Sequence, residues 1–285
     1  MKISIIGSGT VGYAVGKGFS EFGHDVLFCD VSEKRMGKLK EIGENAICEN
    51  KVRDITFIAV PAPTKNDGTI ELRYLTDALR DVGVQLRERE DYPHIVIKST
   101  ILPHLLRGKL IPLLEETSRK KVSEDFGFCY NPEFLREKHA QEDFMHPDRI
   151  ILGACDTRTA KTLEELYRPF DAPIYQVGLE EAAMAKYVAN NFLSTKISYF
   201  NEMYLIAKEW GIDPDMVSTL VKADRRISEY GTVGGREFGG RCLPKDLNAF
   251  LHFSNKKNNP KILQAVKQVN DKMKDSKHRR DIEVD

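Results

Sequence analysis

The chain has 285 residues, of which 41% are hydrophobic, enough to bury one large core or two smaller ones. Lysine plus arginine and aspartate plus glutamate each total 43, so no net charge attracts nucleic acid or a membrane surface. The five cysteines form no CxxC pair, which argues against a zinc site and a disulfide framework. No apolar run reaches the ~18 residues of a membrane span, and no signal peptide opens the chain. We therefore expect a soluble, cytoplasmic protein that binds no metal, nucleic acid or membrane.

The first part of the chain alternates short β-branched runs with helical patterns. Strands are predicted at residues 2–6, 25–30, 55–60 and 94–99, with helices between them at 11–23, 32–43 and 71–90. Later runs at 126–130, 149–152 and 173–177 extend the sheet, with helices at 105–117 and 158–167. This alternation predicts an α/β fold, a Rossmann-type doubly wound parallel sheet covered on both faces. We assign it to residues 1–178.

A glycine-rich turn follows the first predicted strand and opens the first predicted helix. Gly7, Gly9 and Gly12 fit GxGxxG, and Asp30 ends the second strand 18 residues beyond Gly12. Such glycines let the backbone approach a pyrophosphate, and the acid binds a ribose diol while repelling a 2′-phosphate. In this strand–turn–helix–strand context the motif predicts an NAD site. Lys34 and Arg35 keep NADP as an alternative.

The second part of the chain is helical. Residues 179–210 contain no proline or glycine, and Gly211 is a predicted C-cap. A helix of this length that is apolar on more than one side needs partners from its own domain or from a second copy. Further helices are predicted at 213–221, 244–253 and 260–274, the last with Asn259 as cap and Pro260 at its first position. We assign residues 179–274 to a helical central domain and 275–285 to a charged, frayed tail.

One cysteine stands in polar surroundings, in FGGRCLPKD at residues 238–246. Beside an NAD site, a thiolate can attack an aldehyde, and the thiohemiacetal can lose a hydride to become a thioester that water hydrolyses. This chemistry needs an activated thiol, oxyanion donors and a base. Cys242, Lys245 and Asp246 supply such groups. The alternatives are a buried structural cysteine and a purely structural pairing of Lys245 with Asp246.

FGGRCLPKD resembles the GGxCxPKD active-site motif of the UDP-glucose/GDP-mannose dehydrogenase family. Five other segments resemble that family in the same order: GSGTVG at 7–12, VPAPT at 60–64, KST at 98–100, NPEFLRE at 131–137 with PDRIILG at 147–153, and EAAMAKYVANNF at 181–192. The resemblance covers residues 1 to about 272. It implies oxidation of a nucleotide-sugar C6 alcohol to a uronic acid with two NAD⁺, and a homodimer packed through helix 179–210.

The resemblance also bears on the substrate and on domain content. The PKD ending favours UDP-glucose or GDP-mannose over N-acetylmannosamine substrates, and of the two we take UDP-glucose. Family members normally carry a third domain, a C-terminal nucleotide-binding fold, which we expect this chain to lack.

The resemblance implies residue roles. Cys242 is the nucleophile, Lys186 and Asn190 stabilise the oxyanion, Asp246 and Thr100 hold a water, and Glu137 is the base for thioester hydrolysis. The implied NAD contacts are Gly7, Gly9, Thr10, Val11, Gly12, Asp30, Lys34, Val60, Pro61, Thr64 and Thr100. The implied substrate contacts are Glu133, Phe134, Leu135, Arg136, Glu137, Lys186, Asn190, Arg226, Tyr230, Gly239 and Cys242, with loop 231–240 around the pyrophosphate.

Simpler interpretations compete with these roles. Lys186 and Asn190 could be solvated helix residues, and Glu133 an acid in the first turn of a helix. Two other functions fit the same layout. One is a single-hydride hydroxyacid dehydrogenase with an active-site lysine on the long helix. The other is a non-catalytic NAD-binding subunit.

Overall fold

The computed structural model describes residues 1–65, 67–255 and 257–282. The chain divides into two compact units. The first comprises residues 1–63 and 71–186, and the second comprises residues 64–70 and 187–285.

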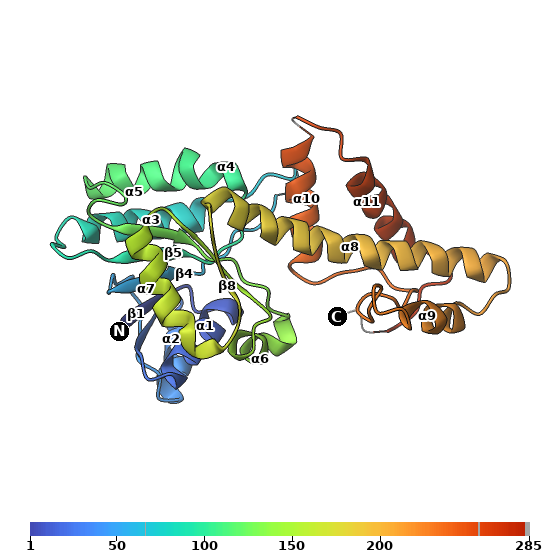
Figure 1. Ribbon diagram of the computed structural model, residues 1–285, viewed down its shortest axis with the longest axis horizontal. Coiled ribbons are helices and arrows are strands. Elements are labelled where there is room, and N and C mark those ends of the chain that lie inside the picture. Colours follow the sequence, from blue (N-terminus) through green and yellow to red (C-terminus); the bar gives the residue numbers. More distant parts are fainter. Residues whose placement is uncertain (66, 256, 283–285) are drawn as a thin grey trace. The chain divides into compact units, whose positions relative to one another are not determined.

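An eight-stranded sheet forms the centre of the first unit (Figure 1). Its order is β3-β2-β1-β4-β5-β6-β7-β8. The strands are β1 (Lys2–Ile6), β2 (Asp25–Cys29), β3 (Ala46–Ile47), β4 (Ile55–Ile58), β5 (His94–Ile97), β6 (Gly127–Tyr130), β7 (Ile150–Ala154) and β8 (Ile174–Val177). All neighbours are parallel except β6 and β7. The doubly wound α/β fold is therefore confirmed, whereas a wholly parallel sheet is wrong. The connection of residues 131–149 does not cross back over the sheet. Strand β7 therefore starts at the same end of the sheet at which β6 stops, and the two run antiparallel.

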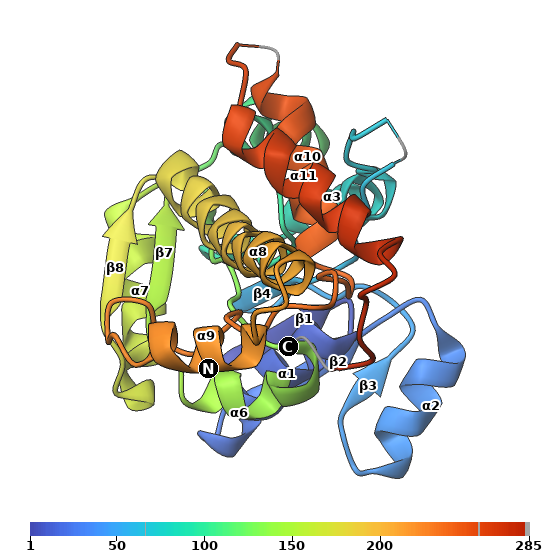
Figure 2. The same cartoon turned by 90° about the vertical axis from the view of Figure 1, so that its right-hand side faces the viewer.

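Helices cover both faces of this sheet (Figures 1 and 2). They are α1 (Thr10–Glu21), α2 (Glu33–Glu41), α3 (Arg73–Leu86), α4 (Pro103–Leu105), α5 (Ile111–Ser118), α6 (Ala140–Met145) and α7 (Thr157–Tyr167), with short turns η1 (Leu106–Leu110), η2 (Glu137–His139) and η3 (Arg168–Phe170). Alternate side chains of the inner strands enter two apolar cores, as the period of two requires. Ile5 and Phe57 face α1 and α6, whereas Ile6 and Ile58 face α3 and α5.

The helix predicted at 105–117 is built from three pieces. Between α4 and α5 the chain makes the π-helical turn η1. Pro112 is the second residue of α5 and has no N–H for the preceding turn, so the regular α-helical ladder is interrupted there.

The second unit is helical. It contains most of α8 (Leu179–Glu209), together with α9 (Pro214–Lys222), α10 (Leu243–Ser254) and α11 (Lys261–Lys274). Helices α10 and α11 lie side by side (Figures 1 and 2). Leu247, Leu251 and Val266 share a core with Ile197 and Phe238. No described helix, α8 included, is both long and apolar enough to cross a membrane.

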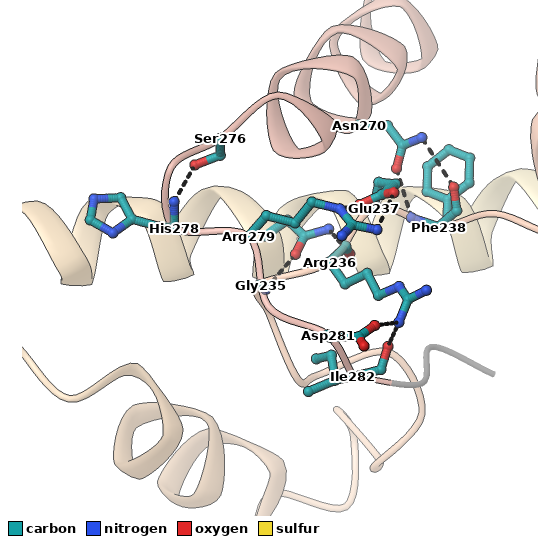
Figure 3. Close-up of polar contacts among 11 residues, drawn as sticks. Gly235, Arg236, Glu237, Phe238, Asn270, Ser276, His278, Arg279, Asp281 and Ile282 are labelled. Atoms are coloured by element: carbon teal, nitrogen blue, oxygen red, sulfur yellow. Dashed lines mark hydrogen bonds and ion pairs between the residues drawn. The ribbon is translucent and has the colours of Figure 1, made fainter.

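Two expectations for this unit are wrong. The N-cap of α11 is Pro260 and not Asn259, and Asn259 contributes its backbone carbonyl, which accepts the Lys261 N–H at 2.9 Å. The predicted tail is also not frayed where it is described. Residues 276–282, named here the C-terminal strap, contact loop 231–240 through arginine side chains and backbone (Figure 3). The remaining tail residues, 283–285, lie outside the described residues.

Candidate active site

The glycine turn of the first unit has the geometry that the motif predicts. Gly7 has a φ of +89°, and a Cβ there would lie 2.8 Å from the backbone of Ala59. A Cβ on Gly12 would lie 1.9 Å from the Gly7 carbonyl oxygen. Neither position admits a side chain, because the turn folds back against β4 and against itself. Both glycines are therefore required by the protein's own packing.

Gly9 differs, because a Cβ there would meet no described atom within 4 Å. Nothing in the protein excludes a side chain at this position, whereas close approach of a pyrophosphate would. Gly9 is also the N-cap of α1, which has no side-chain cap, so the first N–H groups of the helix are left for an anion. These features fit a dinucleotide.

Asp30 lies at the end of β2 beside this turn. Its carboxylate accepts the Ser8 N–H at 2.8 Å and the Ser32 N–H at 3.0 Å, which fixes it where a ribose diol would lie. Arg35 donates Nε to the Ser8 carbonyl at 2.8 Å, while Lys34 is exposed on α2. Arg35 is thus the cation that contacts the turn.

The other expected NAD contacts are distributed over both units. The Val60 carbonyl accepts the Ser99 hydroxyl at 2.6 Å, and Thr100 follows, half-buried. Pro61 is exposed. Thr64 belongs to the second unit, where its Oγ1 donates to the Lys245 carbonyl at 3.1 Å.

A buried ion pair lies at the end of the first unit. Lys186 on α8 donates Nζ to Glu133 Oε1 at 2.8 Å, and both side chains are less than one-tenth exposed. The other oxygen of Glu133 accepts the Leu135 N–H at 2.8 Å. Burial alone would raise the pKa of Glu133, but the Lys186 charge and these hydrogen bonds outweigh it and lower the pKa. Lys186 is therefore not a solvated surface lysine, and Glu133 is not in a helix.

A second buried lysine, the first residue of the KST segment, lies directly after β5. Lys98 donates Nζ to Asn131 Oδ1 at 3.1 Å, and Tyr167 donates its hydroxyl to the same oxygen at 2.6 Å. Burial lowers the pKa of Lys98 to about 8, with Glu133 opposing the shift and Lys186 adding to it. The sequence feature that could have indicated this buried lysine is its place directly after the apolar strand β5.

Residues 134–137 of the NPEFLRE segment have different surroundings. The Phe134 ring lies 3.9 Å from the Arg149 guanidinium carbon, and the Lys186 ammonium is 5.4 Å from its centroid. Arg136 forms an ion pair with Asp143 at 2.6 Å. Glu137 is exposed at the start of η2.

The second unit places the cysteine beside a buried carboxylate. Cys242 is the exposed N-cap of α10, one turn before Asp246. Asp246 is 1% exposed and accepts Asn190 Nδ2 at 2.6 Å, while its other oxygen is ion-paired with Lys245. Asn190 is therefore buried and not a solvated helix residue, and it lies one helical turn after Lys186 on α8.

The remaining expected substrate residues lie in the loops after α9. Arg226 is exposed and forms an ion pair with Asp224 at 2.6 Å. Tyr230 packs against the core of the second unit, and Gly239 is exposed. None of the five cysteines forms a disulfide in the part of the chain that the structure describes, and the same residues contain no cluster of three metal-binding side chains.

Comparison with known families matches almost the whole chain. The model of the UDP-glucose/GDP-mannose dehydrogenase family, NAD binding domain, matches residues 1–54 and 43–171. The model of the central domain of that family matches residues 180–272.

Individual relatives agree. The chain is 35% identical to UDP-glucose 6-dehydrogenase AglM of Haloferax volcanii, over 95% of this chain and 70% of the relative. It is 34% identical to GDP-mannose 6-dehydrogenase of Pseudomonas aeruginosa, over 88% of this chain and 64% of the relative. The solved UDP-glucose dehydrogenase of Pyrobaculum islandicum superposes with a TM-score of 0.89 at 34% identity, over 95% of this chain and 68% of that one. The chain thus spans about two thirds of the length of these proteins.

Proposed function

Because the chain belongs to the UDP-glucose/GDP-mannose dehydrogenase family, we propose that it oxidises the C6 alcohol of a nucleotide sugar to a carboxylate, with UDP-glucose as substrate. The observation that carries this proposal is the placement of Cys242 one turn before a buried Asp246–Asn190 pair. Lys186, the other residue expected to stabilise the oxyanion, is buried on the same long helix as Asn190.

The glycine turn and Asp30 would hold NAD⁺, which would supply the hydride acceptor for two successive oxidations of the substrate. The first oxidation converts the C6 alcohol to an aldehyde and releases one proton. The Cys242 thiol then adds to the aldehyde carbon, forming an S–C bond, and the carbonyl oxygen gains a proton. The second oxidation removes hydride and proton from this thiohemiacetal and leaves a thioester. Water breaks the S–C bond, which yields the acid and restores the thiol.

Lys186 and Asn190 are suited to hold the oxygen on which negative charge develops. They leave one face of α8, one turn apart, and each is fixed by a carboxylate, Glu133 and Asp246 respectively. Donors fixed before the reaction stabilise an oxyanion without reorganising. Removing one such donor typically lowers kcat by about 10²–10³-fold.

Asp246 and Glu137 serve the hydrolytic step in this proposal. Asp246 is buried, and its partners Asn190 and Lys245 hold its carboxylate in place. This suits the orientation of a water. Glu137 is exposed, as a base that exchanges protons with solvent would be.

A panel of UDP- and GDP-sugars, with NADH and uronate both quantified, tests the proposal. We expect two NADH per uronate with UDP-glucose, and no uronate from Cys242→Ala. Full turnover to acid by Cys242→Ala would overturn the covalent mechanism. One NADH per product would favour a single-hydride hydroxyacid dehydrogenase. NAD binding without turnover on any nucleotide sugar would favour a non-catalytic NAD-binding subunit.

The protein also acts as a homodimer in this proposal. Six apolar residues, each between 40% and 79% exposed, recur along α8 and its end: Met184, Val188, Phe192, Tyr199, Ile206 and Trp210. At ~100° per residue they fall within about 80° of one another, on the side of the helix opposite Lys186 and Asn190. This apolar stripe suits a second copy of the helix, because pairing there would leave the catalytic face free.

A further inference from the structure

The loop of residues 232–242 has no helix or strand of its own. Side chains from α8 and α11 nevertheless form hydrogen bonds with its backbone N–H and carbonyl groups. Asn201 on α8 is fully buried. Its Oδ1 accepts the Gly235 N–H at 2.8 Å, and its Nδ2 donates to the Arg236 carbonyl at 2.7 Å. One amide group thus binds the N–H of one loop residue and the carbonyl of the next.

Asn270 on α11 repeats this arrangement three residues further along the loop. Its Oδ1 accepts the Phe238 N–H at 2.8 Å, and its Nδ2 donates to the Phe238 carbonyl at 3.2 Å (Figure 3). The Phe238 ring is 2% exposed and packs in the core of the second unit. Phe238 is therefore held by both its backbone and its side chain.

The C-terminal strap closes over the same loop from outside. Arg279 binds Glu237 through two hydrogen bonds of 2.8 and 2.9 Å (Figure 3). The Arg280 N–H donates to the Gly235 carbonyl at 2.7 Å. A Cβ on Gly234 would lie 2.4 Å from Tyr204 on α8, so the loop lies directly on the helix. Residues 234–238 are thus held from three sides.

The three residues between Phe238 and Cys242 are all exposed, and two are glycines. Phe238 before it and the start of α10 after it are therefore two held points that flank Cys242 in the chain. We propose that Asn270, supported by Asn201, is a positioning residue for Cys242. The catalytic importance of Cys242 rests on the proposed function, but its positioning can be measured without turnover.

Two measurements on Asn270→Ala test this role. Loss of two hydrogen bonds is expected to speed amide hydrogen exchange at Phe238 about tenfold, with the core of the first unit unchanged. The rate of Cys242 alkylation by iodoacetamide, relative to the exposed Cys48, is expected to change at least threefold, because the thiol no longer has one defined position relative to α10. Asn258→Ala, an exposed asparagine of the same unit, is the control and should change neither rate.

Asn270→Asp separates positioning from folding. It keeps the shape and the acceptor for the Phe238 N–H but loses the donor to the Phe238 carbonyl, so an intermediate effect on both rates is expected. If Asn270→Ala does not fold, this variant decides the question. Phe238 exchange or Cys242 alkylation at the wild-type rate in the deciding variant would overturn the proposal. In a panel that shows turnover, the proposal further requires a lower kcat with KM nearly unchanged.

Discussion

Two buried lysines of the first unit stand in different electrostatic surroundings. Lys186 faces the Glu133 carboxylate at 2.8 Å, whereas Lys98 faces the neutral amide oxygen of Asn131 at 3.1 Å. A buried ammonium without a direct counter-ion is destabilising, which explains why burial lowers the pKa of Lys98 to about 8. The protein bears this cost beside its proposed oxyanion donor.

The first prediction at this scale concerns Lys98→Met. Below pH 8 both folded and unfolded wild-type chains carry the Lys98 proton. Between pH 8 and 10.5 the folded chain loses the proton first, so the cost of burying the charge disappears. The free energy of unfolding of the wild type should therefore rise relative to Lys98→Met across this window, by on the order of 3 kcal/mol. Urea unfolding at a series of pH values measures the difference.

The control is Lys38→Met, which removes an exposed lysine on α2. Its unfolding free energy should follow that of the wild type across the same window. If the curves for Lys98→Met and wild type also ran parallel, the assignment of this shift to Lys98 would be wrong.

At the scale of residues, the sequence predicted that Lys186 and Asn190 share a buried face of a helix, which the structure shows. Lys186 and Asn190 are one turn apart in any helix, so their shared face followed from spacing alone. Lys98, Asn201 and Asn270 were not predicted, because their roles depend on partners 33, 34 and 32 residues away. No local pattern marks an asparagine whose amide binds a distant loop.

At the scale of elements, the glycine turn before α1 supports a paired prediction. Gly12→Ala should lower the free energy of unfolding by about 1–3 kcal/mol, because its Cβ would overlap the Gly7 carbonyl at 1.9 Å. Gly9→Ala should leave stability unchanged, since its Cβ meets no described atom within 4 Å, yet weaken NAD binding at least tenfold. Thermal unfolding and titration calorimetry with NAD⁺ measure the two effects. NAD affinity unchanged in Gly9→Ala would contradict the placement of the pyrophosphate.

The prediction of helices and strands from the sequence succeeded for regular segments and failed for β3 and for the direction of β7. The bounds of β1 and α7 agree with the sequence to within a residue, because each is a regular pattern with clear ends. The strand β3 has two residues and shows no period. The direction of β7 depends on how a long connection packs, and its own apolar pattern is the same in either direction.

At the scale of the whole molecule, the apolar stripe of α8 yields a prediction about assembly. Phe192 is 64% exposed near the middle of the stripe, and in the proposed dimer a glutamate in its place would bury a charge against the second copy. Phe192→Glu should therefore be monomeric at micromolar concentration where the wild type is dimeric, as measured by light scattering after gel filtration. Tyr74→Glu, at an exposed aromatic residue on α3, is the matched control and should remain dimeric. A monomeric wild type would refute the dimer.

Helix α8 also limits how this protein can change in length. Lys186, Asn190 and Asn201 leave the same side of one uninterrupted 31-residue helix, and the first and last are about 22 Å apart at 1.5 Å per residue. One inserted or deleted residue between Asn190 and Asn201 would turn everything beyond it by ~100°. Asn201 would then no longer face the loop that leads to Cys242. The segment between Asn190 and Asn201 should therefore tolerate substitutions but not insertions or deletions. We expect its length to be the same in every catalytically active relative.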